Sequence, residues 1–210
     1  MERMCDGWPA TRGEYVVGEP TSAVAVCTLA SRLSPSVHAA VWGGCMTENL
    51  GVEKVVLNII SNSHVRYLLV CGVDTKGHLP GDALISLHTR GIEESGRIRG
   101  AKGAIPYLEH LMAGAVERFQ RQVSVVDMRT VVDVSTMDMR TVVDLPTIYK
   151  KVEELWRAQA FDEPPMVLED EGEERADMEE IEVGGADAII ADGVLLDALN
   201  GVIFCEGDRC

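Results

Sequence analysis

The chain has 210 residues, of which 46% are apolar and 5% aromatic, and its formal net charge at pH 7 is −15. This length and apolar content suit one packed domain with a tail and exclude general disorder. The scarcity of aromatic residues and the negative charge exclude a nucleic-acid-binding surface, because phosphate binding requires clustered Lys and Arg.

The amino terminus shows no secretion signal, because residues 1–12 mix charges with Trp8 and Pro9 and contain no apolar run. The six cysteines form neither a Cys-x-x-Cys pair nor a zinc-like spacing. We therefore expect a cytoplasmic protein with reduced thiols.

The first half of the chain predicts three buried strands and one helix. Residues 22–29 indicate the first strand and residues 37–42 a weaker second one. A helix follows, with apolar residues at 52, 55, 56, 59 and 60, and either Thr47 or Asn49 can cap it. Tyr67–Cys71 is short, continuously apolar and followed by Gly72, which is typical of a strand buried on both faces of a parallel sheet.

The second half continues the alternation of helices and strands. A helix is predicted over residues 82–90, a short strand with a glycine-rich turn over 98–106, and a helix from Pro106 through Phe119. A strand over 122–128 and a helix over 146–160 follow. This order predicts an α/β fold, a Rossmann-like and mostly parallel sheet flanked by helices.

Three segments lie outside that alternation. Asp127–Asp133 recurs as Asp138–Asp144, which we interpret as a duplicated edge segment. Residues 162–182 hold eleven acidic residues and one base, which indicates a solvated acidic linker. The expected division is an α/β domain over 1–160, the linker over 161–182 and an apolar segment over 183–210.

The apolar carboxyl-terminal segment raises the question of a membrane span. It contains Asp187, Asp192 and Asp197, and each aspartate at a bilayer centre costs about 2.5–3.5 kcal/mol. We expect no direct membrane span, but a small helix or hairpin that packs on the protein or on a partner.

His78 lies on the loop that leaves the strand 67–71. In open α/β sheets, ligands bind at loops that follow the carboxyl ends of strands. One interpretation is a loop histidine with only local hydrogen bonds. The other is a metal ligand, and since no second ligand lies nearby in sequence, a lone imidazole suits a metal that its own macrocycle already holds.

Other candidates have simpler explanations. His38, His64, His88 and His110 fit core or surface roles, and Cys45 fits packing better than nucleophilic catalysis because no base adjoins it in sequence. Glu48 can orient a ligand or simply begin a helix. The sequence contains no Walker loop, nucleophile elbow or regular dinucleotide fingerprint, which weakens the alternative of a nucleotide-binding enzyme.

Several blocks, in order over residues 7–128, resemble one family. They are Gly7-Trp8-Pro9, Gly13–Gly18, Thr47–Val56, Lys76-Gly77-His78, Gly100–Pro106 and Val116–Gln120. Together these residues resemble the A subunit of tetrahydromethanopterin S-methyltransferase.

The resemblance implies a Rossmann-like corrinoid carrier that serves methanogenesis, a form of one-carbon metabolism. It would pass a methyl group from methyl-tetrahydromethanopterin to coenzyme M, with His78 as the axial ligand to the cobalt of a cobamide such as 5-hydroxybenzimidazolylcobamide. The implied partners are other methyltransferase subunits or a soluble methyltransferase. The family's carboxyl-terminal membrane anchor is replaced by the acidic run and the aspartate-bearing tail, so we expect a soluble member. The alternative is a cofactor-free paralogue that acts as an interaction protein.

The expected cofactor-binding residues lie on the loops at one end of the sheet, where glycine backbone can approach a ligand closely. No residue is assigned to catalysis by the protein itself, and His78 is the expected metal ligand. The cofactor-binding set is Thr28, Thr47, Glu48, Asn49, Leu50, Gly51, Gly72, Lys76, Gly77, His78, Gly100, Gly103, Ala104, Ile105 and Pro106.

Overall fold

The structure is a computed structural model that describes residues 2–129, 144–168, 187–191, 194–197 and 202–205. The chain divides into two compact units, Met1–Leu168 and Glu169–Cys210. Only the first unit contains helices among its described residues, and it carries every predicted site residue.

The first unit is built on a five-stranded sheet with the order β1-β3-β2-β4-β5. Four strands are parallel: β2 (Val24–Cys27), β3 (Val41–Gly43), β4 (Tyr67–Cys71) and β5 (Ser124–Met128). The short strand β1 (Tyr15–Val17) pairs with β3 in the antiparallel direction at one edge. The mostly parallel α/β architecture expected from the sequence is confirmed.

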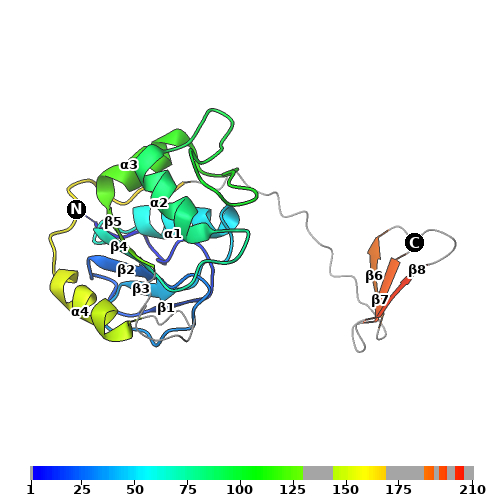
Figure 1. The fold of residues 1–210 in the computed structure, drawn as a ribbon, viewed down its shortest axis with the longest axis horizontal. Coiled ribbons are helices and arrows are strands. Elements are labelled where there is room, and N and C mark those ends of the chain that lie inside the picture. Colours follow the sequence, from blue (N-terminus) through cyan, green and yellow to red (C-terminus); the bar gives the residue numbers. More distant parts are fainter. Residues whose placement is uncertain (1, 130–143, 169–186, 192–193, 198–201, 206–210) are drawn as a thin grey trace, which may run out of the picture. The chain divides into compact units, whose positions relative to one another are not determined.

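Helices cover both faces of this sheet (Figure 1). On one face lie α1 (Leu50–Ile60), α2 (Pro80–Arg90) and α3 (Ala113–Gln122), and on the other lies α4 (Leu145–Leu155). Successive side chains of a strand point to opposite faces, so Ala25 and Cys27 pack with the first three helices, whereas Val24 and Val26 pack against α4. This explains why the central strands are continuously apolar.

The strand order places a topological switch point between β2 and β4. From β2 the chain first moves to β3 on one side, and α1 then returns it to β4 on the other side of β2. The loops after β2 and β4 therefore leave neighbouring strands in opposite directions, which opens the crevice where such folds bind ligands. Each loop holds a non-glycine residue in the left-handed region, Leu29 at φ 53° and Leu79 at φ 50°, a conformation that is costly and concentrates at functional sites.

Some expected element boundaries are wrong. The strand expected over 98–106 is absent from the described residues, where Ile98 forms only an isolated bridge with Ile92. The helix expected from Pro106 begins at Ala113, because the buried carboxylate of Glu53 accepts hydrogen bonds from the backbone N–H groups of Glu109 (2.5 Å) and His110 (2.9 Å). The second strand begins at Val41 rather than at 37, and the edge strand β1 was not expected.

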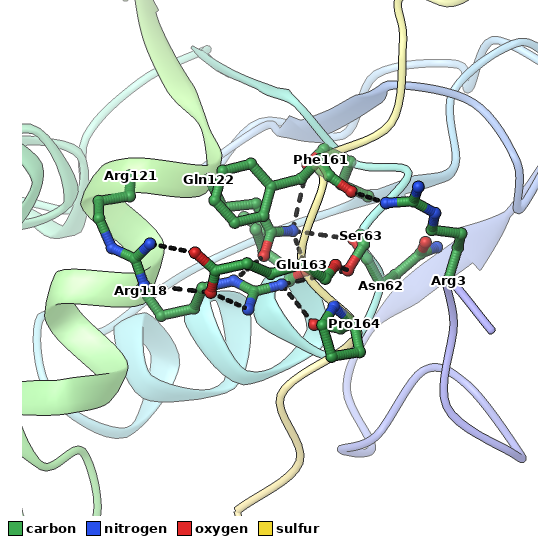
Figure 2. A network of polar contacts seen from close by, with 11 residues as sticks. Arg3, Asn62, Ser63, Arg118, Arg121, Gln122, Phe161, Glu163 and Pro164 are labelled. Atoms are coloured by element: carbon green, nitrogen blue, oxygen red, sulfur yellow. Dashed lines mark hydrogen bonds and ion pairs between the residues drawn. The ribbon is translucent and has the colours of Figure 1, made fainter. Parts of the chain in front are cut away.

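Residues 161–168 pack against the domain and extend it past the boundary expected at residue 160. Figure 2 shows Arg118 beside Glu163, Pro164 and Ser63 in this contact. Ser63 and Gln122 shortly precede β4 and β5, so the contact lies near the amino ends of these strands. The Arg118 guanidinium donates to the Pro164 carbonyl (2.7 Å) and to Glu163 Oε2 (3.1 Å). The Phe161 backbone N–H donates to the Ser63 carbonyl (2.8 Å). This segment is therefore a strap bound to the domain rather than linker.

The second unit contains an antiparallel sheet of β6 (Asp187–Ala191), β7 (Val194–Asp197) and β8 (Val202–Cys205). The sequence predicted either a small helix or a hairpin for this segment. The helix is wrong for the described residues, which form a three-stranded sheet rather than a two-stranded hairpin. Most of the duplicated segment and residues 169–182 of the expected linker lie outside the described residues. Among the described residues, no helix has the length and apolar character needed to cross a bilayer.

Candidate functional site

His78 occupies an exposed position on the loop between β4 and α2. Its side chain is 48% exposed, and the backbone N–H groups of His78 and Leu79 both donate to the carbonyl of Thr75, at 3.2 and 2.9 Å. The loop is short and turned tightly before Pro80 begins α2. The imidazole is thus presented at the carboxyl edge of the sheet, beside the switch point.

A buried carboxylate holds this imidazole. Glu48 Oε2 lies 2.8 Å from His78 Nδ1, and the Glu48 side chain is 0% exposed. Glu48 is placed by the start of α1, where the Asn49 side chain accepts from the Leu50 N–H (2.8 Å) and Thr47 Oγ1 accepts from the Gly51 N–H (3.0 Å). The sequence-based alternative that Glu48 simply begins a helix is therefore incomplete, because its side chain contacts the candidate ligand.

Glu48 is held in its ionised form. Burial by itself raises the pKa of Glu48, but hydrogen bonds from the Ile105 backbone N–H and from its own backbone N–H, together with the contact to His78, outweigh burial and lower the pKa below the usual 4.5. An ionised carboxylate only accepts hydrogen bonds, so Nδ1 of His78 carries the proton that joins the two groups. In the neutral imidazole, Nε2 then keeps its lone pair, and among the described residues Nε2 has no hydrogen-bond partner.

The segment 103–105 closes over the pair from the other side. The Ile105 backbone N–H donates to Glu48 Oε1 (2.6 Å), and the Ala104 N–H donates to the Gly77 carbonyl (3.1 Å). At Gly103 a Cβ atom would lie 2.2 Å from the His78 carbonyl oxygen and 2.8 Å from Glu48 Cγ. Only glycine permits this close approach, which locks the two loops together.

Asp74 fixes the His78 loop to the start of α2. Asp74 Oδ1 accepts from the Gly81 N–H (2.7 Å), a free amide of the helix terminus, and Oδ2 accepts from Arg129 Nη1 (2.8 Å). Arg129 in turn pairs with Asp127 (2.9 Å) at the end of β5. This cluster restrains the loop that carries His78.

Exposed apolar side chains lie on the segments that carry the pair. Met46 is 51% exposed, Leu50 52%, Val73 41% and Ile105 57%. They belong to the loop before α1, the first residue of α1, the His78 loop and the 103–105 segment. We call these four residues the apolar rim.

A cavity of about 1030 Å³ lies at the carboxyl ends of β2 and β3. Its lining includes four residues of the expected set, Thr28, Thr47, Leu50 and Gly51, but not His78 or Glu48. Four expected residues gather around the imidazole instead: Gly77, Gly103, Ala104 and Ile105. One part of the expected set therefore lies at the imidazole and another part lines the cavity.

The remaining expected residues have other surroundings. Asn49 caps α1, and Gly72 packs against the loop after β2, where an added Cβ would lie 2.3 Å from the Thr28 carbonyl oxygen. Lys76 is exposed, Pro106 is buried and accepts from the Ile98 N–H (2.8 Å), and Gly100 lies against Arg90 at the end of α2.

The other candidates from the sequence take structural roles. Cys45 is buried, and a hydrogen bond with Cys27, together with burial, raises its pKa well above the usual 9.0, so it remains a thiol. His88 Nε2 bonds the Val123 carbonyl (2.8 Å), and His38 Nδ1 pairs with the exposed Glu153 (2.5 Å). In the described ranges, no three His, Cys, Asp or Glu side chains are grouped to hold a metal ion.

Fold and site together define a Rossmann-like α/β domain that presents a carboxylate-held imidazole at its switch point. The comparisons with known proteins identify the family. Residues 2–178 match the family model for the A subunit of tetrahydromethanopterin S-methyltransferase. The chain belongs to this family of methyltransferase subunits, and the resemblance found in the sequence is confirmed.

Three relatives show the extent of the similarity. The chain is 40% identical to the Mtx methyltransferase A subunit of Methanosarcina acetivorans over 205 residues, which are 97% of each chain. It is 50% identical to the corresponding Mtx protein of Methanosarcina barkeri over 127 residues, 60% of this chain and 64% of that protein. It is 45% identical to the tetrahydromethanopterin S-methyltransferase A subunit of Methanohalophilus mahii over 185 residues, 85% of this chain and 71% of that protein.

Proposed function

We propose that this chain is a corrinoid carrier of a methyltransferase, in which a cobamide is bound with His78 as the axial ligand of its cobalt. It would accept a methyl group and pass it on, as in transfer from methyl-tetrahydromethanopterin to coenzyme M. The observation that carries this proposal is the 2.8 Å contact between His78 Nδ1 and the buried carboxylate of Glu48. Membership of a methyltransferase subunit family supports the reaction class.

The contact matters because metal-ligating histidines almost always donate their other ring N–H to an oxygen acceptor, which fixes the tautomer and raises ligand basicity. Here Nδ1 donates to Glu48, and the free lone pair on Nε2 is a good donor to a transition metal such as cobalt.

The surroundings fit a flat, largely apolar macrocycle. The four residues of the apolar rim offer exposed hydrocarbon on the segments that carry His78 and Glu48, and one imidazole suits a metal whose other positions are filled by its own ring. When bound, a cobamide supplies the cobalt that takes up and releases the methyl group, while the protein holds and tunes it. The roles left to this chain are to bind the cofactor, to fix the tautomer of His78 and to hold the loop in place.

We further propose that the chain works with other proteins in the cytoplasm. A carrier needs one partner that loads the methyl group and another that removes it, so other subunits or a soluble methyltransferase would dock near the exposed face of His78. The similarity to the Mtx protein of Methanosarcina acetivorans, over 97% of each chain, favours a methyltransferase of that kind.

The test is titration of the purified chain with cobalamin at pH 8, followed by visible absorption. The wild-type chain should bind the cofactor and give the spectrum of a histidine-ligated cobalt, and His78→Ala should lose that spectrum while it keeps its fold by circular dichroism. His38→Ala is the matched control, because His38 also pairs through Nδ1 with a carboxylate, Glu153, but lies away from the switch point. A wild-type chain that takes up no corrinoid would overturn the proposal and favour the cofactor-free interaction protein.

A further inference from the structure

A second cavity, of about 890 Å³, is a groove between the turn 92–99 and the segment 105–113. Three large apolar side chains in its lining are exposed: Ile105 by 57%, Tyr107 by 40% and Met112 by 72%. Aromatic residues and methionine are enriched at the cores of protein–protein interfaces, and the rims of such interfaces are polar. The composition of this groove therefore suits contact with another protein.

Backbone contacts hold the two walls of the groove together. The Leu108 N–H donates to the Gly96 carbonyl (3.0 Å), and the Ile98 N–H donates to the Pro106 carbonyl (2.8 Å). Gly96 has a φ of 79°, and an added Cβ there would lie 2.6 Å from the Leu108 carbonyl oxygen. The shape of the groove is therefore set by the backbone.

The charge of the groove is negative. Its lining includes three exposed glutamates, Glu93, Glu94 and Glu109, and one exposed cation, Arg99. In the part of the chain that the structure describes, none of these three carboxylates forms an ion pair. We call this cavity the acidic groove. Its charge and its exposed hydrocarbon complement a segment that carries Lys or Arg beside apolar side chains.

The carboxyl-terminal part of this chain does not have that character. Residues 162–210 contain sixteen acidic residues and two basic ones, and a second copy of the chain carries the same net charge of −15. Like charges that face each other across an interface oppose binding and suppress wrong partners. Charge complementarity therefore favours a segment of a different protein.

The acidic groove is connected to the imidazole site through Ile105. The side chain of Ile105 lines the groove, and its backbone N–H donates to Glu48 Oε1 (2.6 Å). Glu48 in turn contacts His78. A protein seated in the groove thus contacts the segment that closes over the Glu48–His78 pair.

We infer that the acidic groove docks a basic, apolar segment of the partner protein with which this carrier works. Tyr107 and Met112 contact the apolar side chains of that segment, and Glu93, Glu94 and Glu109 pair with its cations. The role of the partner rests on the proposed function, but binding of such a segment is measured without a corrinoid.

The probe is a short synthetic peptide of lysine and leucine, titrated into the cofactor-free chain by isothermal titration calorimetry. Wild type should bind it, and Glu93→Gln/Glu94→Gln should weaken the affinity about tenfold. A factor of ten is about 1.4 kcal/mol, within what two exposed ion pairs contribute. A wild-type chain that does not bind the peptide would overturn the inference.

The matched control for charge is Glu153→Gln/Glu154→Gln. It makes the same change in net charge at two adjacent glutamates of α4, whose side chains are 52% and 47% exposed and which packs on the other face of the sheet. This variant should keep the wild-type affinity. An equal loss in both variants would show that only the overall charge attracts the peptide, and would overturn the inference.

Met112→Gln tests the apolar part of the groove. It should also weaken peptide binding, whereas Val37→Thr should not, because Val37 is equally exposed at 72% but lies outside the groove. A peptide of lysine and serine should bind wild type more weakly than the peptide of lysine and leucine. Equal affinities for the two peptides would contradict an apolar contact.

The place of binding is read from the backbone amide resonances in ¹H–¹⁵N spectra. The peptide should shift the resonances of residues 92–99 and 105–113, that of Ile105 among them; shifts confined to other segments would place the peptide elsewhere and refute the docking site. A dimer in sedimentation that Met112→Gln dissociates would assign the groove to a second copy instead. Failure of these tests leaves the cobalamin titration of wild type and His78→Ala unaffected, so the inference and the proposed function fail separately.

Discussion

Replacement of Glu48 by glutamine is the sharpest test of how the site works. The carboxylate uses both oxygens, Oε1 for the Ile105 N–H at 2.6 Å and Oε2 for His78 Nδ1 at 2.8 Å. Glutamine has the same size but offers one carbonyl oxygen. If that oxygen stays with Ile105, the amide NH₂ faces His78, and two donors then confront each other. His78 relieves the conflict by moving its proton from Nδ1 to Nε2, the atom proposed to bind cobalt.

The expected loss of corrinoid affinity follows from this change of tautomer. To restore the ligating tautomer, the variant must leave a buried donor unpaired, which costs about 1–3 kcal/mol, or roughly a factor of 5 to 150. Loss of partners of this kind lowers metal affinity about 10–100-fold in other proteins. We therefore expect Glu48→Gln to weaken corrinoid binding by about ten- to a hundredfold.

Two measurements check this expectation. Binding is followed by visible absorption at pH 8. The tautomer of the cofactor-free protein is read from the ¹⁵N shifts of the His78 ring, which should show the unprotonated nitrogen at Nε2 in wild type and at Nδ1 in the variant.

Glu53→Gln is the matched control for this change. Glu53 is also a buried glutamate on α1 that accepts from backbone N–H groups, those of Glu109 and His110, and it has no described contact with His78. This variant should be less stable but should keep the wild-type tautomer. An unchanged tautomer and affinity in Glu48→Gln would refute the assignment of Glu48 as the residue that orients the imidazole.

Three further expectations concern packing and pH. Gly103→Ala should weaken corrinoid binding more than Gly114→Ala on α3, since an added Cβ at Gly103 meets the His78 carbonyl oxygen at 2.2 Å whereas at Gly114 no atom lies within 4 Å; equal effects would contradict the locked loops. Arg118→Leu should lower the free energy of unfolding by about 3 kcal/mol and the Tm by roughly 6–12 °C, measured by calorimetry, because it breaks a buried charge network (Figure 2). The exposed Arg121, which shares Glu163, is its control, and an equal loss in Arg121→Leu would argue against burial as the cause. Because the pKa of Glu48 is below 4.5 when folded, its stabilisation is present above that pH and is lost as the pH falls through the folded pKa, so the wild-type unfolding midpoint should drop more steeply in acid than that of Glu48→Gln.

The central strands and most helices could be predicted because their patterns are local. Tyr67–Cys71 matches β4 residue for residue, since a continuous apolar run followed by glycine has few other stable outcomes. The helix expected after Asn49 matches α1, which Asn49 caps. The errors lie where a distant side chain overrides the pattern, as when Glu53 accepts the amides of Glu109 and His110 and delays α3.

The candidate site shows the same division. The glycine-flanked His78 after a buried strand could be singled out from the sequence, because loops at strand ends are where such folds bind ligands. The partner of His78 could not be singled out in the same way. Glu48 precedes His78 by 30 residues and contacts it only when α1 and the loop after β4 come together at the switch point. The cations that line the cavity also come from segments far apart along the chain: Arg12 precedes β1, Arg32 follows β2 and Lys54 lies on α1.

The amino-acid sequence by itself determined the alternation of strands and helices, the family and the histidine to examine. The apolar runs and the family motifs are formed by residues that are neighbours along the chain, so the sequence alone reveals them. Only the tertiary structure decided that a buried carboxylate fixes one tautomer of that histidine and that a cavity forms at the carboxyl ends of β2 and β3. Both depend on distances between segments far apart along the chain, which are set when the sheet and its helices pack.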